Sequence, residues 1–548
     1  MSRKILITAA LPYANGDIHI GHIVEYLQAD IWARFQNLVG NECRYICADD
    51  THGTPIMLNA QKQGITPEEL VNRCFDQHVK DFHDFEIKFT HFDSTNTDTN
   101  REMAENIYLK MKENGHIETR DVKQNYCEHD KMFLPDRFVK GTCPKCGAKH
   151  QYGDACEVCS STYSSDDLKD KYCVICKNEP TKKSSEHIFF KLNHFREFLQ
   201  GWVKEHTQKE VANKLQEWLS DDLQDWDISR DEPYFGFKIP GTDNKYFYVW
   251  VDAPVGYISS TKRWCDENQK DYLEYWAEDS DAEIYHFIGK DIVYFHTLFW
   301  PAMLKNAGIK TPEQVFVHGF LNINGEKMSK SRGTFIMART YLKHLDPMYL
   351  RYYYATKLSS SVEDIDLNFE DFSNRINSEL VGKITNLASR GAQMLNKKID
   401  GKMGPISKEG LDRIQAAKEK SKLIAQHYED RNYNKALSEI RNIADETNRY
   451  FDEKEPWKMI KNDVESTREV LTTTLNLFRI MAIYLKPVLP KYVGNVEKLF
   501  NEKPYVWNST HYHLENHQIN AFEHLAKRVD MESIDNIVEE QKQMSNPK

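Results

Sequence analysis

The sequence predicts an α/β fold in which a doubly wound parallel sheet is split by a cysteine-rich insert and followed by an all-α helix bundle. Three observations predict this arrangement. Short apolar runs alternate with segments of helical periodicity up to about residue 115, and strand-like runs resume near residue 245. Cysteines and turn residues gather between these two regions. Long helical periodicity takes over beyond about residue 355.

These changes in pattern divide the chain into five expected segments. Residues 1–115 and 231–323 form the two halves of the sheet domain, and residues 116–230 form the insert between them. Residues 324–384 carry a Lys-Ser loop and a connecting region, and residues 385–548 form the helical domain.

The first elements place a turn where a ligand can bind. Ile5–Ala10 is an apolar run of strand length, and apolar residues then recur at helical spacing from Ile20 to Phe35. The intervening residues therefore form a strand-to-helix turn. Further buried strands are expected at Lys245–Trp250, Ile284–Ile288 and Val315–His318. In a doubly wound sheet, ligands collect beyond the carboxyl ends of the strands at the switch point, which is where this turn would lie.

The last third of the chain reads as a helix bundle. Apolar residues recur there with a helical period, at Leu380, Ile384 and Leu387, at Leu437, Ile440 and Ile443, and at Leu475, Leu477, Ile480 and Ile483. The polar run at residues 539–543 is expected to be loose.

Composition limits the class of protein. The chain has 548 residues, of which 40% are hydrophobic, and no apolar run long enough to span a bilayer. Arg3 and Lys4 precede an apolar run that is too short for a secretory signal, so we expect a cytoplasmic protein without membrane partners. The net charge of -11 argues against a general polyanion binder, and any nucleic-acid contact needs a local basic face.

Eleven cysteines in a chain without a secretory signal favour metal ligation or buried thiols over disulfides. Two C-x-x-C hooks, separated by a short loop with glycine, have the spacing of a four-thiolate zinc knuckle: Cys143, Cys146, Cys156 and Cys159. Four thiolates leave no open position, so this zinc would be structural. A third hook, Cys173 and Cys176, has Cys127 and its neighbours as the nearest candidate partner. We expect the remaining cysteines to be ordinary buried thiols: Cys43, Cys47, Cys74 and Cys265.

Two short runs predict an ATP site that forms an adenylate. Pro12-Tyr13-Ala14-Asn15-Gly16-Asp17-Ile18-His19-Ile20-Gly21-His22 spans the strand-to-helix turn, and Lys327-Met328-Ser329-Lys330-Ser331 follows a later strand. A helix start favours anions, and His19 and His22, three residues apart, share one face. Gly21 lets phosphates approach the backbone. Lys327 and Lys330 would supply charge for departing pyrophosphate. Each run alone is commonly structural or solvated, and their joint occurrence favours the catalytic interpretation.

These two runs resemble the HIGH and KMSKS signatures of the class I aminoacyl-tRNA synthetases. Three longer segments are similar to the bacterial, methionine-specific branch with a zinc-binding connective insert: Cys47–Pro55, Tyr248–Tyr257 and Phe287–His296. The resemblance covers essentially the whole chain. It implies a Rossmann-type sheet, activation of L-methionine with ATP and Mg²⁺ to methionyl-adenylate, and transfer to the 3′ end of tRNA(Met). Residues 324–384 would contact the tRNA stem.

The resemblance also assigns site residues. The methionine pocket would comprise Leu11, Tyr13, Asp50, Trp250, Pro254, Tyr257, Ile292 and His296, and the ATP site Gly21, Gly289, Asp291 and Lys330. Aromatic and aliphatic walls suit a thioether, and a carboxylate at Asp50 suits the substrate ammonium. The alternative is that these aromatics fill the core. Asn386, Arg390 and Trp457 stand where the family reads the anticodon, with the alternative that the tryptophan is buried in the bundle.

The second metal site and the competing functions stay open at this point. Where some relatives carry a second C-x-x-C hook, this chain has Cys127 and Asp130. The fourth ligand beside Cys127, Cys173 and Cys176 is therefore either Asp130 or His129, or the site is empty or oxidisable.

The insert is too short for a separate editing domain. The chain as it stands is expected to be monomeric. A small-molecule adenylyltransferase and a non-catalytic zinc-knuckle RNA-binding protein are the alternative functions.

Overall fold

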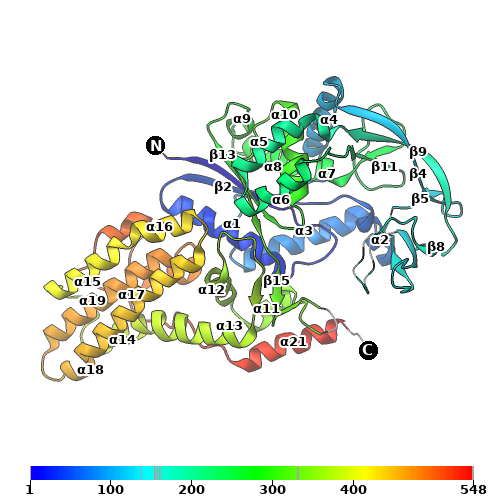
Figure 1. Ribbon diagram of the computed structural model, residues 1–548. Coiled ribbons are helices and arrows are strands. Elements are labelled where there is room, and N and C mark those ends of the chain that lie inside the picture. The colour runs from blue at the N-terminus through cyan, green and yellow to red at the C-terminus, as the bar shows by residue number, and fades with distance from the viewer. Residues whose placement is uncertain are drawn as a thin grey trace.

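The computed structural model describes residues 2–545 apart from 136–137, 154–155, 157, 160, 162 and 330–331. Its central element is a five-stranded sheet with the order β14-β13-β1-β2-β3, and every pairing in it is parallel. The strands are β1 (Lys4–Ala9), β2 (Glu42–Asp49), β3 (His91–Ser94), β13 (Glu283–Gly289) and β14 (Gln314–His318). The predicted α/β fold is confirmed (Figure 1).

The sheet is covered on both faces. Ile5 and Ile7 of β1 pack into a cluster with α1 (Ile20–Leu38), whereas Leu6 packs into a second cluster with α4, α8 and α10. Successive side chains of a strand point to opposite faces, so an almost wholly apolar strand needs helices on each side. These and the neighbouring helices of this region are α2 (Thr54–Gln63), α3 (Pro67–Asp84), α4 (Asp98–Glu113), α7 (Val249–Asp252), α8 (Val255–Glu267), α9 (Leu273–Trp276) and α10 (Trp300–Ala307), with a π-helical turn at Phe295–Phe299.

The strand order creates one switch point. From β1 the chain proceeds outward through β2 and β3, and it returns to the other side of β1 with β13 and β14. The turn after β1 therefore lies beside the loops that follow β13 and β14. The helix α3 has a strong start signal, because Thr66 and Glu69 form a capping box around Pro67.

The insert leaves the sheet as a long antiparallel ribbon. β4 (Ile117–Cys127) pairs with β9 (Thr181–Phe190) in unbroken register from Ile117 opposite Phe190 to Tyr126 opposite Thr181. The ribbon curves away from the sheet toward a small cysteine-rich unit (Figure 1). The other strands of the insert and its base are β5 (Met132–Phe133), β6 (Val139–Thr142), β7 (Gln151–Tyr152), β8 (Lys169–Cys173), β10 (Trp226–Asp227), β11 (Ser229–Asp231) and β12 (Lys245–Phe247). Its helices are a 3₁₀ turn at Leu192–Phe195, α5 (Arg196–His206) and α6 (Lys209–Leu219).

A short sheet and two helices connect the sheet domain to the bundle. β15 (Leu321–Ile323) pairs with β16 (Glu326–Lys327) and with β17 (Ile365–Leu367). α11 (Ala338–His344) and α12 (Pro347–Lys357) pack in the same core cluster as α1. The predicted Lys-Ser loop therefore begins at β16.

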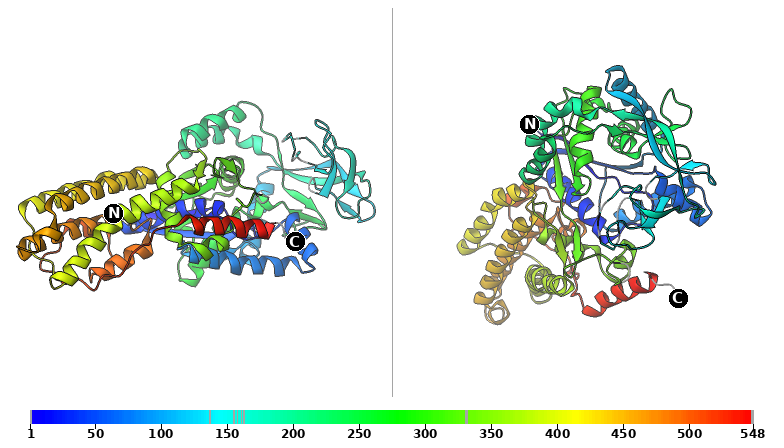
Figure 2. Two further views of the ribbon diagram at one scale, coloured as in Figure 1. Left: turned by 90° about the horizontal axis from the view of Figure 1, so that it is seen from below. Right: turned by 45° about the vertical axis from the view of Figure 1, so that its right-hand side comes forward.

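The helical bundle extends away from the sheet domain (Figure 2). Its central helix is α19 (Val464–Leu485), which is buried over most of its length and packs against α14, α15, α17 and α20. The bundle helices are α13 (Phe369–Arg375), a π-helical segment Ile376–Thr385, α14 (Asn386–Lys398), α15 (Lys408–Glu419), α16 (Ser421–Glu429), α17 (Tyr433–Lys454), α18 (Pro456–Met459), α20 (Pro490–Leu499) and a 3₁₀ turn at Trp507–His511. No helix of the described residues is long and apolar enough to cross a membrane.

The prediction of a loose C-terminal run was wrong. Residues 539–543 belong to α21 (Met531–Ser545), which packs on α11. Ile534 and Ile537 enter the core, and Glu540 pairs with Lys343 and His344 of α11. A polar run is compatible with a helix when its apolar neighbours one turn earlier dock against the protein and its charges are matched.

Candidate active site

A cavity of about 910 Å³ lies at the carboxyl edge of the parallel sheet. Its walls come from the turn after β1, from α1, from α7 and α8, from the segment after β13, and from the loop after β16. Predicted residues from five separate stretches of the chain meet in it: Leu11, Tyr13, His19, Gly21, His22, Asp50, Trp250, Pro254, Tyr257, Gly289, Asp291, Ile292, His296 and Lys327. Lys330, the remaining predicted ATP residue, lies outside the described residues.

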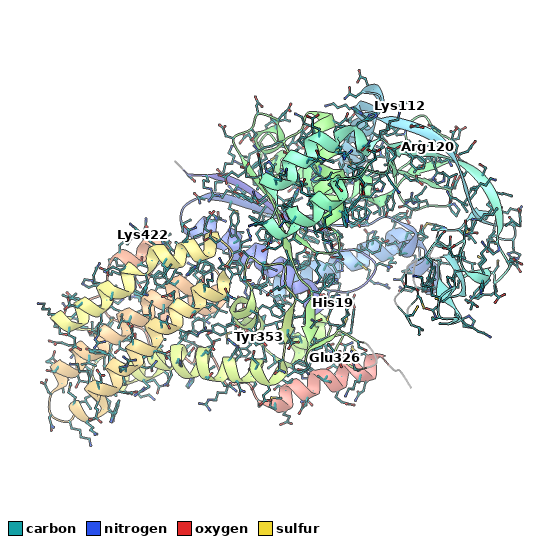
Figure 3. All side chains as sticks on the ribbon, viewed as in Figure 1. His19, Lys112, Arg120, Glu326, Tyr353 and Lys422 are labelled. Atoms are coloured by element: carbon teal, nitrogen blue, oxygen red, sulfur yellow. The ribbon has the colours of Figure 1, made fainter. Side chains whose placement is uncertain are left out.

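His19 and His22 are held at the first turn of α1 (Figure 3, which labels His19). His19 is the N-cap residue, and its Nδ1 accepts a hydrogen bond from the backbone N–H of His22 at 3.3 Å. In return His22 Nδ1 accepts from the backbone N–H of His19 at 3.3 Å, and the two rings stack with centroids 3.5 Å apart. Enclosure by protein and the neighbouring His19 and His78 keep the pKa of His22 well below its usual range. His22 is therefore neutral at pH 7, and because its Nδ1 already accepts from the His19 N–H, its hydrogen is on Nε2, which can donate to a ligand.

Two glycines leave space where a side chain would collide. A Cβ at Gly21 would lie 2.7 Å from Met328 Cε, and a Cβ at Gly289 would lie 2.7 Å from Asp291 Oδ1. Both distances are below van der Waals contact. The missing side chains thus leave room for Met328 beside Gly21 and for Asp291 beside Gly289, and both of these residues line the cavity.

The wall beyond Gly289 carries the predicted Asp291 and two polar residues that the sequence did not assign to the site, Glu25 and His318. Glu25 Oε2 lies 3.1 Å from His318 Nε2, and Asp291 contributes a further carboxylate. Burial raises the pKa of Glu25 even though His318 opposes this shift. Carboxylates and an imidazole at one end of a cavity suit the hydroxyl groups of a ribose. A sequence signal existed for Glu25, because this acid interrupts the apolar run between Ile23 and Leu27.

The opposite end of the cavity is apolar and contains one oriented histidine. Burial lowers the pKa of His296 to about 4, so this ring is neutral. Its Nδ1 faces the carbonyl of Ile292 at 3.1 Å and must carry the hydrogen, because a carbonyl can only accept. The lone pair is therefore on Nε2, where the hydroxyl of Tyr257 donates at 2.8 Å. The tautomer and the rotation of the Tyr257 hydroxyl are both fixed.

Aromatic contact shapes the same end of the cavity. The Trp250 ring stacks on Phe295 with centroids 3.8 Å apart and an interplanar angle of 7°. Its edge faces His296 at 5.8 Å. Leu11 closes the pocket from the β1 side, where its Cδ1 lies 2.9 Å from the position of a Cβ at Gly256. An apolar, polarisable surface of this kind suits a thioether side chain.

Asp50 supplies an unmatched carboxylate at the edge of this pocket. Its Oδ1 is buried and has no hydrogen-bond partner among the described residues. Burial, with repulsion from Asp252, raises the pKa of Asp50 well above its usual range. A buried acceptor without a partner is costly, and a cationic ligand such as an ammonium would satisfy it.

The end of β16 brings Lys327 to the cavity. Lys327 ends β16, and Arg332 pairs with Glu326 at 2.6 Å while donating to the carbonyl of Lys327 at 3.1 Å. Met328 reaches Gly21 across the cavity. Lys327 and the two histidines are thus on walls that face one space, as the sequence predicted. Lys330 and Ser331 are outside the described residues.

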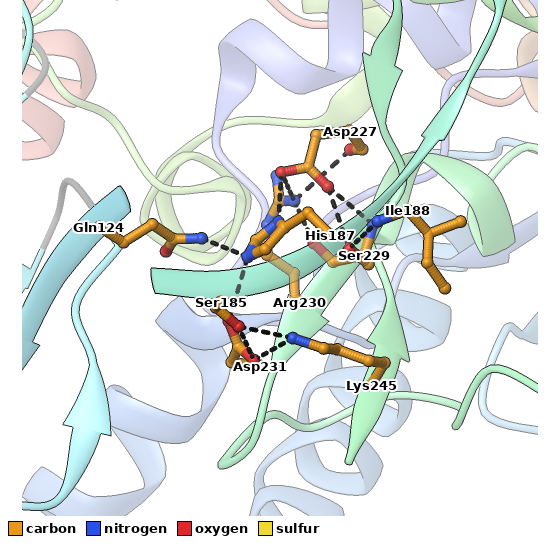
Figure 4. Close-up of polar contacts among 9 residues, drawn as sticks. All are labelled: Gln124, Ser185, His187, Ile188, Asp227, Ser229, Arg230, Asp231 and Lys245. Carbon is orange, nitrogen blue, oxygen red and sulfur yellow. Dashed lines mark hydrogen bonds and ion pairs between the residues drawn. The ribbon is translucent and has the colours of Figure 1, made fainter. Parts of the chain in front are cut away.

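Arg230 is a further cation in the wall, and a charged cluster at the base of the insert holds it (Figure 4). Its guanidinium lies 3.8 Å from the ring centroid of Tyr248 and donates to the carbonyl of Ser229. In the cluster, His187 of β9 binds Asp227 at 2.6 Å and Asp231 at 3.1 Å. Burial lowers the pKa of His187, but these two carboxylates raise it overall. The insert is therefore tied by charge to the strand that presents Arg230.

Two groups of metal-ligating side chains lie in the insert. The four predicted thiols, Cys143, Cys146, Cys156 and Cys159, have their sulfur atoms within 4.8 Å of one another. Sulfur separations of 3.9 Å for Cys143–Cys159 and 3.6 Å for Cys146–Cys156 bracket the ~3.8 Å edge of a tetrahedron with Zn–S bonds of about 2.3 Å. This donor set fits a metal ion of tetrahedral preference.

The second group answers the question that the sequence left open. Asp130 Oδ2 lies 3.1 Å from Cys127 Sγ and 3.2 Å from Cys173 Sγ, and Cys176 completes the set. The exposed His129 ring is outside the set and binds the other oxygen of Asp130 at 3.0 Å. The group that could hold a metal ion therefore has Asp130, not His129, as its fourth ligand.

The predicted anticodon residues lie on one side of the bundle. Asn386 and Arg390 are one turn apart on α14, and the Arg390 guanidinium lies 5.4 Å from the ring centroid of Trp457 in α18. Asp452 binds the same guanidinium at 2.7 Å. Trp457 is 39% exposed, so the alternative of a core tryptophan is wrong. An exposed indole beside an arginine suits stacking of an unpaired base.

Comparisons with known proteins agree with these features. Residues 5–392 match the family model for class I tRNA synthetases (M), and residues 401–540 match the anticodon binding domain of methionyl tRNA ligase. A methionine–tRNA ligase of Bdellovibrio bacteriovorus is 61% identical over 539 residues, which are 98% of this chain and 78% of that protein.

Solved structures show the same fold. The Mycobacterium tuberculosis methionyl-tRNA synthetase in complex with methionyl-adenylate superposes with a TM-score of 0.79 at 24% identity, covering 96% of this chain and 99% of that chain. Its apo form gives a TM-score of 0.73 at 22% identity, covering 97% and 99%.

Proposed function

Because the chain belongs to the class I tRNA synthetases, and within them to the methionine–tRNA ligases, we propose that its sheet-edge cavity forms methionyl-adenylate and passes the methionyl group to tRNA(Met). The observation that carries this assignment of the site is the meeting of three segments in one cavity. The first turn of α1, the loop at Lys327 and the apolar wall around Trp250 face the same space.

The first step is attack of the methionine carboxylate on the α-phosphorus of ATP, with pyrophosphate leaving. The N-terminus of α1 and the neutral ring of His22 stabilise charge that develops on the α-phosphate, and His19 orients His22. Lys327 and Lys330 act on the departing pyrophosphate. Positioning and electrostatics account for the rate without a covalent enzyme intermediate. Mg²⁺ bound to ATP would supply positive charge that neutralises the phosphates.

The two ends of the cavity divide the substrates between them. ATP lies along Gly21 and Gly289, with its ribose toward Asp291 and Glu25. Methionine places its ammonium at Asp50 and its thioether between Trp250 and the Tyr257–His296 pair, and the remaining wall comes from Leu11, Tyr13, Pro254 and Ile292. The second step is attack by a 3′-terminal ribose hydroxyl of tRNA on the adenylate carbonyl, which releases AMP.

The insert and the bundle have supporting roles. Zinc is the ion proposed for the cluster at Cys143, where four thiolates leave no open position and the role is structural. The same ion is proposed for Cys127, Asp130, Cys173 and Cys176. Asn386, Arg390 and Trp457 bind the anticodon, with the exposed indole stacking on one base. The protein is proposed to act as a monomer in the cytoplasm, which analytical ultracentrifugation and fractionation would test.

Exchange of labelled pyrophosphate into ATP tests the function directly. Exchange should depend on methionine, and leucine or isoleucine should not replace it. A charging assay with tRNA(Met) then tests the second step. Exchange that proceeds without an amino acid would instead indicate a small-molecule adenylyltransferase, and absence of exchange with retained RNA binding would indicate a non-catalytic protein.

A further inference from the structure

His78 is buried directly behind the turn that leads into His19. It lies on α3, and its ring is fully enclosed. Its Nδ1 is 2.8 Å from Asp49 Oδ1 at the carboxyl end of β2, and its Nε2 is 2.8 Å from the backbone carbonyl of Gly16. One side chain therefore joins the sheet edge to the turn between β1 and α1.

Both neighbours of the ring are hydrogen-bond acceptors. The Gly16 carbonyl can only accept, so Nε2 must carry a hydrogen. The Asp49 carboxylate accepts when ionised, so Nδ1 carries a hydrogen as well, or the same proton sits on Asp49. In either case His78 and Asp49 together hold one proton more than a neutral histidine and an ionised aspartate would hold. This proton is what allows both contacts to exist together.

The Gly16 carbonyl is three residues before His19, so its position sets the entry of the chain into α1. The same turn is held from outside by Asn59 Nδ2, which donates to the carbonyl of Asn15 at 3.0 Å. At its far end the carbonyl of Ile18 accepts from Ala338 N–H at 2.9 Å. The bond from His78 fixes the middle of the turn from the buried side.

We propose that His78 is a positioning residue for adenylate formation: by donating to the Gly16 carbonyl it fixes the turn that aims His19 and His22 at the nucleotide. This inference rests on the proposed function, because it concerns the rate of that reaction. His78 lines the protein interior and not the cavity, so it acts through the backbone of the turn and does not touch the substrates.

Protonation of the pair should make this positioning depend on pH. Asp49 faces the ring from β2 and His22 from α1. Asp81 lies on α3 itself, where Arg339 of α11 pairs with it and Asp17 of the turn adds a further negative charge near it. Burial lowers the pKa of His78, but the bond to Asp49 and its charge raise it overall. A raised histidine pKa means that the double contact is complete at low pH and is lost as pH rises through that pKa. The one remaining ring hydrogen then stays on Nδ1, bonded to the Asp49 carboxylate, so the lone pair of Nε2 faces the lone pairs of the Gly16 carbonyl.

Two substitutions separate the Gly16 contact from simple burial. In H78Q the amide nitrogen takes the place of Nε2 and can still donate to Gly16, whereas in H78N it takes the place of Nδ1 and reaches only Asp49. The maximal rate of methionine-dependent pyrophosphate exchange should fall in H78N by about 10- to 100-fold, the range expected when a buried acceptor loses its donor. H78Q should keep most of the rate. Methionine affinity, measured by isothermal titration calorimetry, should change less than threefold in both.

H83N is the matched control, since His83 is on the same helix with an exposed side chain that contacts only its neighbour Asp84 among the described residues. It should exchange pyrophosphate at the wild-type rate. The wild-type rate should also decline at alkaline pH, and this decline should be absent in H78Q. If H78N fails to fold, the comparison of wild type and H78Q across pH still decides. Equal losses in H78Q and H78N, or an unchanged alkaline limb in H78Q, would overturn the proposal. Absence of exchange in the wild type would count against the proposed function instead.

Discussion

Methionine binding should release a proton from Asp50. In the free protein, burial and repulsion from Asp252 raise the pKa of this carboxyl well above its usual range, and its Oδ1 is buried without a partner among the described residues. A bound ammonium favours the ionised carboxylate. The affinity for methionine should therefore fall as pH falls through the raised pKa of Asp50, approaching a tenfold loss per pH unit below it.

The substitution D50N isolates the charge. The amide keeps an oxygen acceptor of the same shape, so the loss is the difference between a charged and a neutral hydrogen bond, about 1 to 2 kcal/mol. This corresponds to an increase in the dissociation constant for methionine of about 5- to 30-fold. Removal of the buried carboxyl also removes its repulsion with Asp252, so D50N should fold at least as well as the wild type.

Isothermal titration calorimetry in two buffers of different ionisation enthalpy measures both quantities. The wild type should release close to one proton per methionine bound when titrated below the pKa of Asp50, and D50N should release none at the same pH. If the methionine ammonium binds elsewhere, D50N should bind methionine with a dissociation constant within twofold of that of the wild type and should release the same number of protons. That result would refute the placement of the substrate amine.

Three further predictions concern the cavity walls and the insert. Y257F removes the hydroxyl that donates to His296 Nε2, so the free energy of unfolding should fall by about 1 to 3 kcal/mol, and urea denaturation would show no change if that bond were absent. G289A places a Cβ 2.7 Å from Asp291 Oδ1, so the KM for ATP should rise on the order of tenfold while methionine affinity is kept. G494A is the control, because a Cβ at Gly494 meets open space. Equal KM values for ATP in G289A and the wild type would contradict the close approach of Asp291 to Gly289. C156S should abolish tight binding of one metal ion per chain. The wild-type protein should lose that metal ion as pH falls, because the cysteines bind it only as deprotonated thiolates. Elemental analysis that finds the same metal content in C156S and the wild type would exclude the proposed cluster.

The sequence predicted those parts of the molecule that depend on neighbouring residues. The alternation of strand-length and helical apolar patterns predicted the parallel sheet and the bundle, since each element must bury a face of its own period. The spacing of Cys143, Cys146, Cys156 and Cys159 predicted their cluster, because a hook two residues wide brings both sulfur atoms to one point. His19 and His22 are likewise neighbours on one helix turn.

The residues of the methionine pocket came from a resemblance, and nothing in their spacing placed them together. Tyr257 and His296 are 39 positions apart, and the tautomer that joins them depends on the carbonyl of Ile292 and on burial. The choice of Asp130 over His129 in the second cysteine group was equally beyond the sequence. Both are near Cys127, and the fold turns the carboxylate toward the thiols and the imidazole toward solvent.

The sequence by itself determined the periodic elements, the metal hooks and the two signature runs, because local geometry follows from residue spacing. Tertiary structure decided how distant side chains complete the site. His78 reaches Gly16 across 62 positions, Arg230 reaches the cavity through the charged cluster around His187, and α21 docks on α11 in spite of its polar composition. Each of these contacts depends on burial and on the direction of a hydrogen bond, and both properties exist only after the chain has folded.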